Sequence, residues 1–155
     1  MERGLSLANE KSDYPGSLAQ FQRAVREYPD YYEAYMQMGM VYLKMGNAAK
    51  FEEMLRTSID MSRHKYPDAL FNLAFVYSNQ KRFADAEPLA REAVKLSPSS
   101  WEANLELARA LHGLDQSAEA EASALEALRI HPDNAPIYLI LANIHLKLRN
   151  YAGLV

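Results

Sequence analysis

Residues 67–100 read PDALFNLAFVYSNQKRFADAEPLAREAVKLSPSS, and the pattern of this stretch returns along the chain. The pair Leu-Ala at 73–74 recurs at 107–108 and again at 141–142, a spacing of 34 residues. A fixed period in this range means that each repeat is one supersecondary unit, which cannot bury its own apolar face and must stack on its neighbours. The period therefore predicts a repeat architecture before any residue is considered for chemistry.

Two helices are expected in each repeat, because apolar residues recur at i, i+3, i+4 and i+7. The first helices are expected at 32–45, 67–80, 101–114 and 135–148, and the second helices at 16–28, 48–63, 83–97 and 117–131. Turn residues such as Gly46-Asn47 and Ser97-Pro98 separate them. The loops are short, so neighbouring helices must run antiparallel.

Small residues recur at equivalent positions, or slots, where two helices are expected to cross closely. On the first helices these are Gly39, Ala74, Ala108 and Ala142, and on the second helices they are Ala24, Ser58, Ala86, Ala93, Ala120 and Ala127. A side chain larger than alanine would push the helix axes apart. These slots must therefore stay small while their neighbours stay large.

This pattern resembles the tetratricopeptide repeat (TPR). The residues that carry the resemblance are Leu70-Leu73-Ala74-Tyr77 with Ala86-Ala90-Ala93-Pro98, Asn104-Leu107-Ala108-Leu111 with Ala120-Ala124-Ala127-Pro132, Tyr35-Met38-Gly39-Tyr42, and Phe21-Ala24-Pro29. The resemblance covers about residues 14–155 and implies an all-α fold, a right-handed α-solenoid of antiparallel helix pairs known as the TPR superhelix. It also implies that His145, in place of the family's core Tyr, is a hydrogen-bonded core residue.

The resemblance implies one TPR array over residues 1–155. It comprises a partial repeat 1–31, full repeats 32–66, 67–100 and 101–134, and a partial repeat 135–155. One extra residue is expected near His64–Tyr66. Residues 1–13 are too short for a complete first helix, and Asn150–Val155 is expected to open a second one. The sequence is therefore expected to be a fragment of a longer protein, with uncapped terminal helices that self-associate.

One repeat departs from the family's pattern of large and small residues. Phe51 occupies the slot where the family carries Ala, while Ala48 occupies the slot of a large aromatic residue. A size exchange that preserves core volume explains both positions. A local shift of register is the alternative.

The sequence lacks the motifs of most catalytic and metal sites. It has no cysteine and only six glycines. Of its four histidines, no two are spaced i, i+4, the spacing that would place both on one face of a helix to bind a metal. The sequence contains no HExxH motif, no GxSxG motif and no glycine-rich phosphate loop. We therefore predict that the chain is not an enzyme and holds no cofactor or metal.

Charge and hydropathy indicate the class of partner. The net charge of −3 disfavours nucleic acid, and no run of 18 apolar residues exists to span a membrane. The N-terminus also lacks the features of a signal peptide. The compartment stays unknown. A soluble, cytoplasmic protein is the default expectation, with the periplasm or another compartment open if the sequence belongs to a longer precursor.

In the TPR family the first helices line a concave groove. By that resemblance, the candidate peptide-binding residues are Met36, Met40, Leu43, Lys44, Phe71, Phe75, Asn79, Leu105, Arg109, His112, Asn143 and Lys147. The same slots hold Glu33, Asp68, Ser78, Glu102, Gly113, Pro136, Leu139 and Leu146. The earlier part is apolar and rich in adaptable methionine, and the later part adds groups that bind carboxylates or carbonyls. Alternatively, Met36, Phe71 and Leu105 simply pack between adjacent repeats.

The resemblance implies a non-enzymatic scaffold that binds a peptide or amphipathic helix of a partner protein in this groove. One alternative is a structural or oligomerisation module of a larger multidomain protein. A weaker one is an RNA-binding helical repeat, since tyrosines gather at 28–42, although Glu27, Asp30 and Glu33 are interleaved with them.

Some members of the family hold the C-terminal carboxylate of chaperone tails in a clamp of Lys, Asn, Lys and Arg. The matching slots here carry Met36, Met40 and Asn72, and no repeat has a lysine at its fifth slot. The clamp is largely absent. Binding to heat-shock chaperone tails is therefore not expected.

Overall fold

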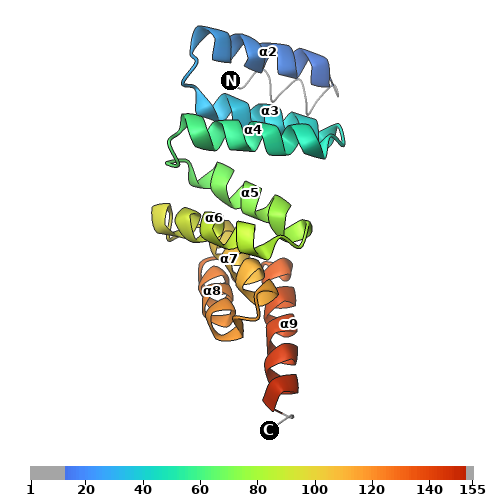
Figure 1. Ribbon diagram of the computed structural model, residues 1–155, viewed down its shortest axis with the longest axis vertical. Helices are drawn as coiled ribbons and strands as arrows, with labels where there is room; N and C mark the ends of the chain where they lie inside the picture. The colour runs from blue at the N-terminus through green and yellow to red at the C-terminus, as the bar shows by residue number, and fades with distance from the viewer. Residues whose placement is uncertain (1–12, 153–155) are drawn as a thin grey trace. The chain divides into compact units, whose positions relative to one another are not determined.

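The computed structural model describes residues 13–152, which form eight α-helices and no strand (Figure 1). The helices are α2 (Tyr14–Glu27), α3 (Tyr32–Lys44), α4 (Ala48–Met61), α5 (Pro67–Asn79), α6 (Phe83–Leu96), α7 (Trp101–Gly113), α8 (Ser117–Ile130) and α9 (Ala135–Ala152). The expected all-α class and the pairing of helices are confirmed. None of these helices is long and apolar enough to cross a membrane.

The first helix of each complete pair ends in a tight turn with a left-handed residue. These residues are Gly46, Lys81 and Asp115, with φ of 75°, 59° and 65°. In each turn the next N–H donates back into the last helical turn, as Asn47 N–H does to the Tyr42 carbonyl at 2.9 Å. This closure satisfies carbonyls that the helix end would leave unpaired. It also turns the chain back so that the second helix packs on the first.

Local capping sets the start of several helices. The Asp13 carboxylate accepts from Gly16 N–H at 2.9 Å, and the Asn47 side chain accepts from Lys50 N–H at 3.0 Å. Ser100 Oγ accepts from Ala103 N–H at 3.2 Å. Each side chain satisfies one backbone donor in the first turn. Because Asp13 is the cap, α2 begins two residues before the expected Gly16.

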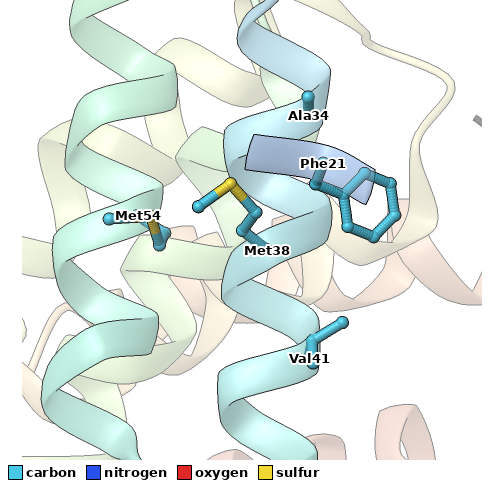
Figure 2. Packing of buried hydrophobic residues seen from close by; sticks show 5 residues of the cluster. All are labelled: Phe21, Ala34, Met38, Val41 and Met54. Atoms are coloured by element: carbon cyan, nitrogen blue, oxygen red, sulfur yellow. The ribbon is translucent and has the colours of Figure 1, made fainter. Parts of the chain in front are cut away.

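The chain divides into two compact units, Met1–Ala69 and Leu70–Val155, and each is described by itself. In the first unit α3 lies beside both α2 and α4. Figure 2 shows the buried cluster that joins these helices: Phe21, Ala34, Met38, Val41 and Met54. Phe21, on α2, is 1% exposed, and Tyr14, Leu18 and Val25 of the same helix pack against the cluster, so burial of apolar side chains anchors α2 on α3.

The departure at Phe51 is a size exchange across α3 and α4. Phe51 is 2% exposed, and a Cβ on Gly39 would lie 3.2 Å from its ring carbon Cδ2. In the other complete repeats the same two slots hold Ala74 with Ala86 and Ala108 with Ala120. The large side chain on α4 thus faces the smallest residue on α3. Packing at this site favours the exchange over a shift of register.

The extra residue of the second repeat lies in the loop between α4 and α5. This loop, 62–66, is one residue longer than the loops 28–31, 97–100 and 131–134. Arg63 and His64 both adopt positive φ, 51° and 59°. Tyr66 at the end of the loop packs against Tyr32, with ring centroids 5.2 Å apart. The insertion is thus absorbed outside the helices.

In the second unit α7 packs against α6 and α8, and α9 packs against α8 and α7. Most of the small slots in this unit are fully buried. Ala74, Ala86, Ala93, Ala108, Ala120 and Ala127 are all 0% exposed. The full burial of these six residues agrees with the prediction that the small slots are packed between helices.

Helix α9 corrects three expectations. It runs unbroken to Ala152, so no second helix opens at Asn150. Ala142 is exposed rather than packed at a crossing. The His145 side chain is 57% exposed and pairs with Glu121 at 2.7 Å, so it is hydrogen-bonded but not in the core.

These differences share one cause. Arg149 occupies the slot where Gly46 and Asp115 turn left-handed, but it stays helical. A left-handed non-glycine residue costs about 1 kcal/mol or more, which is offset only when a second helix packs back on the first. Within the described residues no helix packs back in this way on α9. The remaining expectations for residues 1–12 and 153–155 lie outside the described residues.

Candidate functional site

The candidate residues of the first unit lie on one face of α3. Met36, Met40 and Leu43 stand at i, i+4 and i+7, so they share a face. Met36 is 9% exposed, Met40 is half-buried and Leu43 is 41% exposed. Lys44 beside them is exposed. Met36 is therefore mainly a packing residue, whereas Leu43 presents apolar surface to a partner.

The candidate residues on α5 that belong to the second unit are Phe71, Phe75 and Asn79. Phe71 is half-buried, while Phe75 and Asn79 are exposed. The Arg109 guanidinium carbon lies 6.0 Å from the centroid of the Phe75 ring. This distance is at the outer limit of a cation–π contact. An apolar ring and a positive charge thus stand together on this surface.

Helix α7 carries three candidates with different surroundings. Leu105 is 4% exposed, which favours packing between helices over direct ligand contact. Arg109 is partly exposed, and its Nε lies 3.5 Å from Glu106 Oε1. Burial raises the pKa of Glu106 to about 7, although the Arg109 charge opposes that shift. Burial thus favours the protonated form of the Glu106 carboxyl group.

Glu106 is the residue of this surface that the repeat pattern does not reveal. It is 6% exposed and lies between Leu105 and Leu107 in an apolar helix. An acidic residue between two core leucines is the only signal in the sequence. Its burial depends on neighbouring helices, so the sequence alone does not show it.

His112 and Lys147 join α7 to α9. Lys147 Nζ donates to the His112 carbonyl at 3.2 Å and forms an ion pair with Asp115. Burial and the Lys147 charge lower the pKa of His112, while Asp115 opposes them. His112 is therefore a neutral imidazole at pH 7. Lys147 is engaged by these contacts, so its main role in this unit is to hold α9 against the turn after α7.

The remaining candidate, Asn143, is exposed on α9. Leu139 and Leu146 share its face at i−4 and i+3 and are 65% and 61% exposed. This part of α9 is thus an apolar surface around one amide.

Three candidates meet at a cavity of about 160 Å³ in the second unit. Its lining residues are Ser78, Asn79, Phe83, Arg109, His112, Gly113 and Ile140. The sequence predicts Asn79, Arg109 and His112 as ligand residues and places Ser78 and Gly113 on the same face. Phe83 and Ile140 come from other faces of the repeat, and the sequence does not predict them. Within residues 13–152 no group of three His, Asp or Glu side chains is placed to hold a metal ion.

Comparison with known proteins agrees with this architecture. Two sequence models of the tetratricopeptide repeat match the chain, one over residues 71–135 and the other over residues 32–65. Together they cover more than half of the chain. Among curated proteins, Protein O-mannosyl-transferase TMTC3 of Homo sapiens is 24% identical over 160 residues. The match covers 94% of this chain but only 17% of that protein's length.

Solved structures share the fold at low sequence identity. MamA 41-end from Desulfovibrio magneticus RS-1 has a TM-score of 0.80 and 15% identity, over 98% of this chain and 85% of that one. The first TPR of Spaghetti (RPAP3) bound to HSP90 peptide SRMEEVD has a TM-score of 0.70 and 24% identity, over 76% and 93%. The helix pairs, their buried small slots and both matching repeat models lead to one conclusion: the chain belongs to the tetratricopeptide repeat family.

Proposed function

We propose that this chain is a protein-interaction module that binds an extended peptide or an amphipathic helix of a partner protein. The binding faces are those of the first helices, α3 in the first unit and α5, α7 and α9 in the second. One observation carries the proposal. Phe75 remains exposed beside Arg109, which offers an apolar contact and a positive charge to one ligand.

The exposed apolar residues of these faces support the same function. Leu43, Phe75, Leu139 and Leu146 are between 36% and 65% exposed. Met40 is half-buried beside Leu43 and supplies a flexible side chain that can adapt to different ligands. Met36 and Leu105 contribute to packing beneath these faces rather than to the faces themselves.

Peptide binding by a structural relative adds support. The RPAP3 repeat domain is named as bound to a peptide that ends in Glu-Glu-Val-Asp. Our chain has Met36, Met40 and Asn72 at the slots of the chaperone-tail clamp. We therefore infer that its partner is a different peptide.

The matched curated relatives are named as transferases, but the match covers 17% of the TMTC3 protein. We infer that the repeats themselves are non-catalytic. The described residues offer a surface of apolar and singly charged groups, with none of the clusters of ligating side chains that a metal-assisted reaction requires. If the segment belongs to a similar longer protein, its role there is to bind a partner.

A peptide selected from a random display library against the wild-type chain tests the proposal. Its affinity is measured by fluorescence anisotropy for the wild type, Met40→Glu and Phe75→Glu. The matched control is Leu125→Glu, because Leu125 is 48% exposed but lies on the second helix α8. Phe75→Glu should weaken binding by about tenfold or more, and the control by less than about twofold. All variants should keep the helical circular dichroism spectrum.

Two results would refute this function. If Phe75→Glu and Met40→Glu bind the selected peptide as tightly as the wild type, these faces are not the binding site. If Leu125→Glu weakens binding as much as Phe75→Glu, the effect does not come from the first helices. An RNA partner would instead show salt-dependent binding of single-stranded RNA, which the acidic net charge disfavours.

Self-association is the second candidate function, and the structure of α9 favours it. Tyr138, Ala142 and His145 stand at i, i+4 and i+7, on the face where a complete repeat would pack its second helix. All three are exposed. We propose that a second copy of the chain covers this face, as expected for a structural or oligomerisation module.

A further inference from the structure

A pocket of about 440 Å³ lies where the start of α8 meets the end of α9. Most of its wall surface is apolar, and its lining residues are Asp115, Gln116, Ser117, Ala118, Glu119 and Leu148. An apolar cavity of about 150 Å³ is enough to hold benzene. The pocket therefore has room for an aromatic side chain.

The preceding repeat fills the equivalent place with a ring of its own. Phe83 stands 34 residues before Ser117, and each is the first residue of its helix. The Phe83 ring lies directly on Gly113 of α7, where a Cβ would collide with it. On α9 the slot of Gly113 holds Lys147, whose side chain pairs with Asp115. Ser117 is too small to replace the ring, so the pocket marks the place where this repeat lacks an aromatic side chain.

The hydroxyl group of Ser117 indicates what kind of ring would fit. Ser117 is 7% exposed, and its Oγ is buried with no hydrogen-bond partner. Buried polar atoms are nearly always paired in folded proteins. A tyrosine would both fill the apolar space and offer its hydroxyl group to this serine.

Tyr138 of a second copy is placed to supply that ring. Tyr138 is 53% exposed on α9, but about 15 Å of helix separates it from Leu148 of its own copy. If α9 of a second copy runs antiparallel and crosses level with Asn143, Tyr138 of each copy stands opposite Leu148 of the other, because both are five residues from the crossing. Ala142 beside the crossing is exposed and small, so the two helices can approach closely.

The same register brings opposite charges together. Arg149 follows Tyr138 by 11 residues, or about three helical turns, so it lies on the same face, and it is exposed. In this register Arg149 of one copy is level with Ile137 of the other. Asp133 is exposed in the loop about one helical turn before Ile137, within reach of an extended arginine side chain. A two-fold interface repeats this contact at both ends, and such charge pairs fix its register.

We propose that two copies of the chain pair through antiparallel α9 helices, and that each inserts Tyr138 into the pocket of the other. The inference rests on self-association, the second candidate function, and identifies both the residue that the second copy contributes and the site that it completes. Each pocket is incomplete without the other copy. The contact between Arg149 and Asp133 sets the register.

Disulfide trapping tests the register, because the chain has no cysteine of its own. Tyr138→Cys and Leu148→Cys are purified separately, mixed and mildly oxidised. The mixture should give disulfide-linked heterodimers, which require Cα atoms within about 7 Å. Neither variant alone should form a linked dimer, because its two cysteines would lie about 15 Å apart along the paired helices. The matched control mixes Leu139→Cys with Leu148→Cys, since Leu139 is 65% exposed on a different face of α9.

Two sets of variants test the contacts by sedimentation. Tyr138→Ala should raise the dimer dissociation constant about tenfold or more, whereas Tyr138→Phe, which keeps the ring, should raise it only severalfold. Leu139→Ala should change it by less than about twofold. Arg149→Glu should weaken the dimer severalfold, and adding Asp133→Arg should restore it, because the charge pair is then reversed.

The results separate this inference from the function on which it rests. If the wild type forms dimers but Tyr138→Ala dimerises equally well, or the double charge reversal is no better than Arg149→Glu, the ring exchange is refuted and self-association stands. Equal yields of linked dimers from the test and control mixtures would refute the register in the same way. If the wild type is a monomer at every concentration and no mixture forms linked dimers, both fail.

Discussion

Gly39 on α3 faces Phe51 on α4 so closely that a Cβ on Gly39 would lie 3.2 Å from the Phe51 ring. Glycine at 39 and phenylalanine at 51 both depart from the alanines that the other complete repeats carry at these slots, and this contact shows that the two side chains compensate each other in size. Gly39→Leu should therefore lower the free energy of unfolding by about 2 kcal/mol through overpacking. Denaturant unfolding followed by circular dichroism measures the change.

A double-mutant cycle isolates this contact. In the Phe51→Ala background the cost of Gly39→Leu should shrink, with a coupling of about 1 kcal/mol or more. Strictly additive effects of the two substitutions would show that the residues do not share one packing site.

Ser58 joins α4 to the start of α3. Its Oγ donates to the Tyr32 carbonyl at 2.8 Å, and the residue is 0% exposed. Ser58→Ala should destabilise the chain by about 1 kcal/mol, because it removes the hydrogen bond that joins the two helices. The equivalent slot in the other repeats holds Ala24, Ala93 or Ala127. An alanine side chain therefore fits this position, and the substitution tests the loss of the hydrogen bond alone.

The matched control for Ser58 is Thr57→Ala, whose hydroxyl donates at 3.0 Å only to Glu53 within its own helix. That variant should change the urea midpoint very little. Equal shifts of the midpoint for both variants would mean that the hydrogen bond between the helices adds no stability.

Glu106 should make stability depend on pH. Its pKa rises from the ordinary value of 4.5 to about 7 in the folded chain, mainly through burial. The folded state therefore binds more protons than the unfolded state between these values, and stability falls as pH rises through them. The loss approaches about 3 kcal/mol above pH 7.

Glu106→Gln removes this titration. Relative to the wild type, the variant should gain stability as pH rises from about 4.5 to 7 and keep the gain above that range. Unfolding curves at several pH values measure the difference. A wild type that instead gains stability over the variant with rising pH would show that the ion pair with Arg109 outweighs burial.

The exposed face of α9 should cause concentration-dependent association. Tyr138 is 53% exposed on that face, so Tyr138→Glu should reduce the dimer fraction in sedimentation experiments by placing a charge in the interface. Leu125→Glu on α8 should leave it unchanged. A wild type that sediments as a monomer at every concentration would exclude the second candidate function.

Much of the fold follows from local sequence. Asn47 and Ser100 cap helices, and Gly46 provides a left-handed turn that its sequence context favours. The helix boundaries are therefore predictable to within one or two residues at most ends. The expectations for Ala142 and His145 are wrong because their slots are buried only when a second helix packs on α9, and a sequence pattern does not test for that neighbour.

The candidate site is predictable only in part. The resemblance to the repeat family identifies Asn79, Arg109 and His112 by their slots, and all three line the cavity. The contributions of Phe83 and Ile140 come from other helices and depend on how α6 and α9 lie on α7. The raised pKa of Glu106 likewise depends on burial by several helices.

The 34-residue period and the small slots by themselves determined that the chain folds as stacked helix pairs, because short-range periodicity fixes which face each helix must bury. Only the tertiary structure decided that Gly39 receives the Phe51 ring, that Lys147 is held by Asp115, and that Phe83 and Ile140 line one cavity with Asn79, Arg109 and His112. Such contacts join residues tens of positions apart. They depend on side-chain packing between helices, which the repeat pattern does not specify.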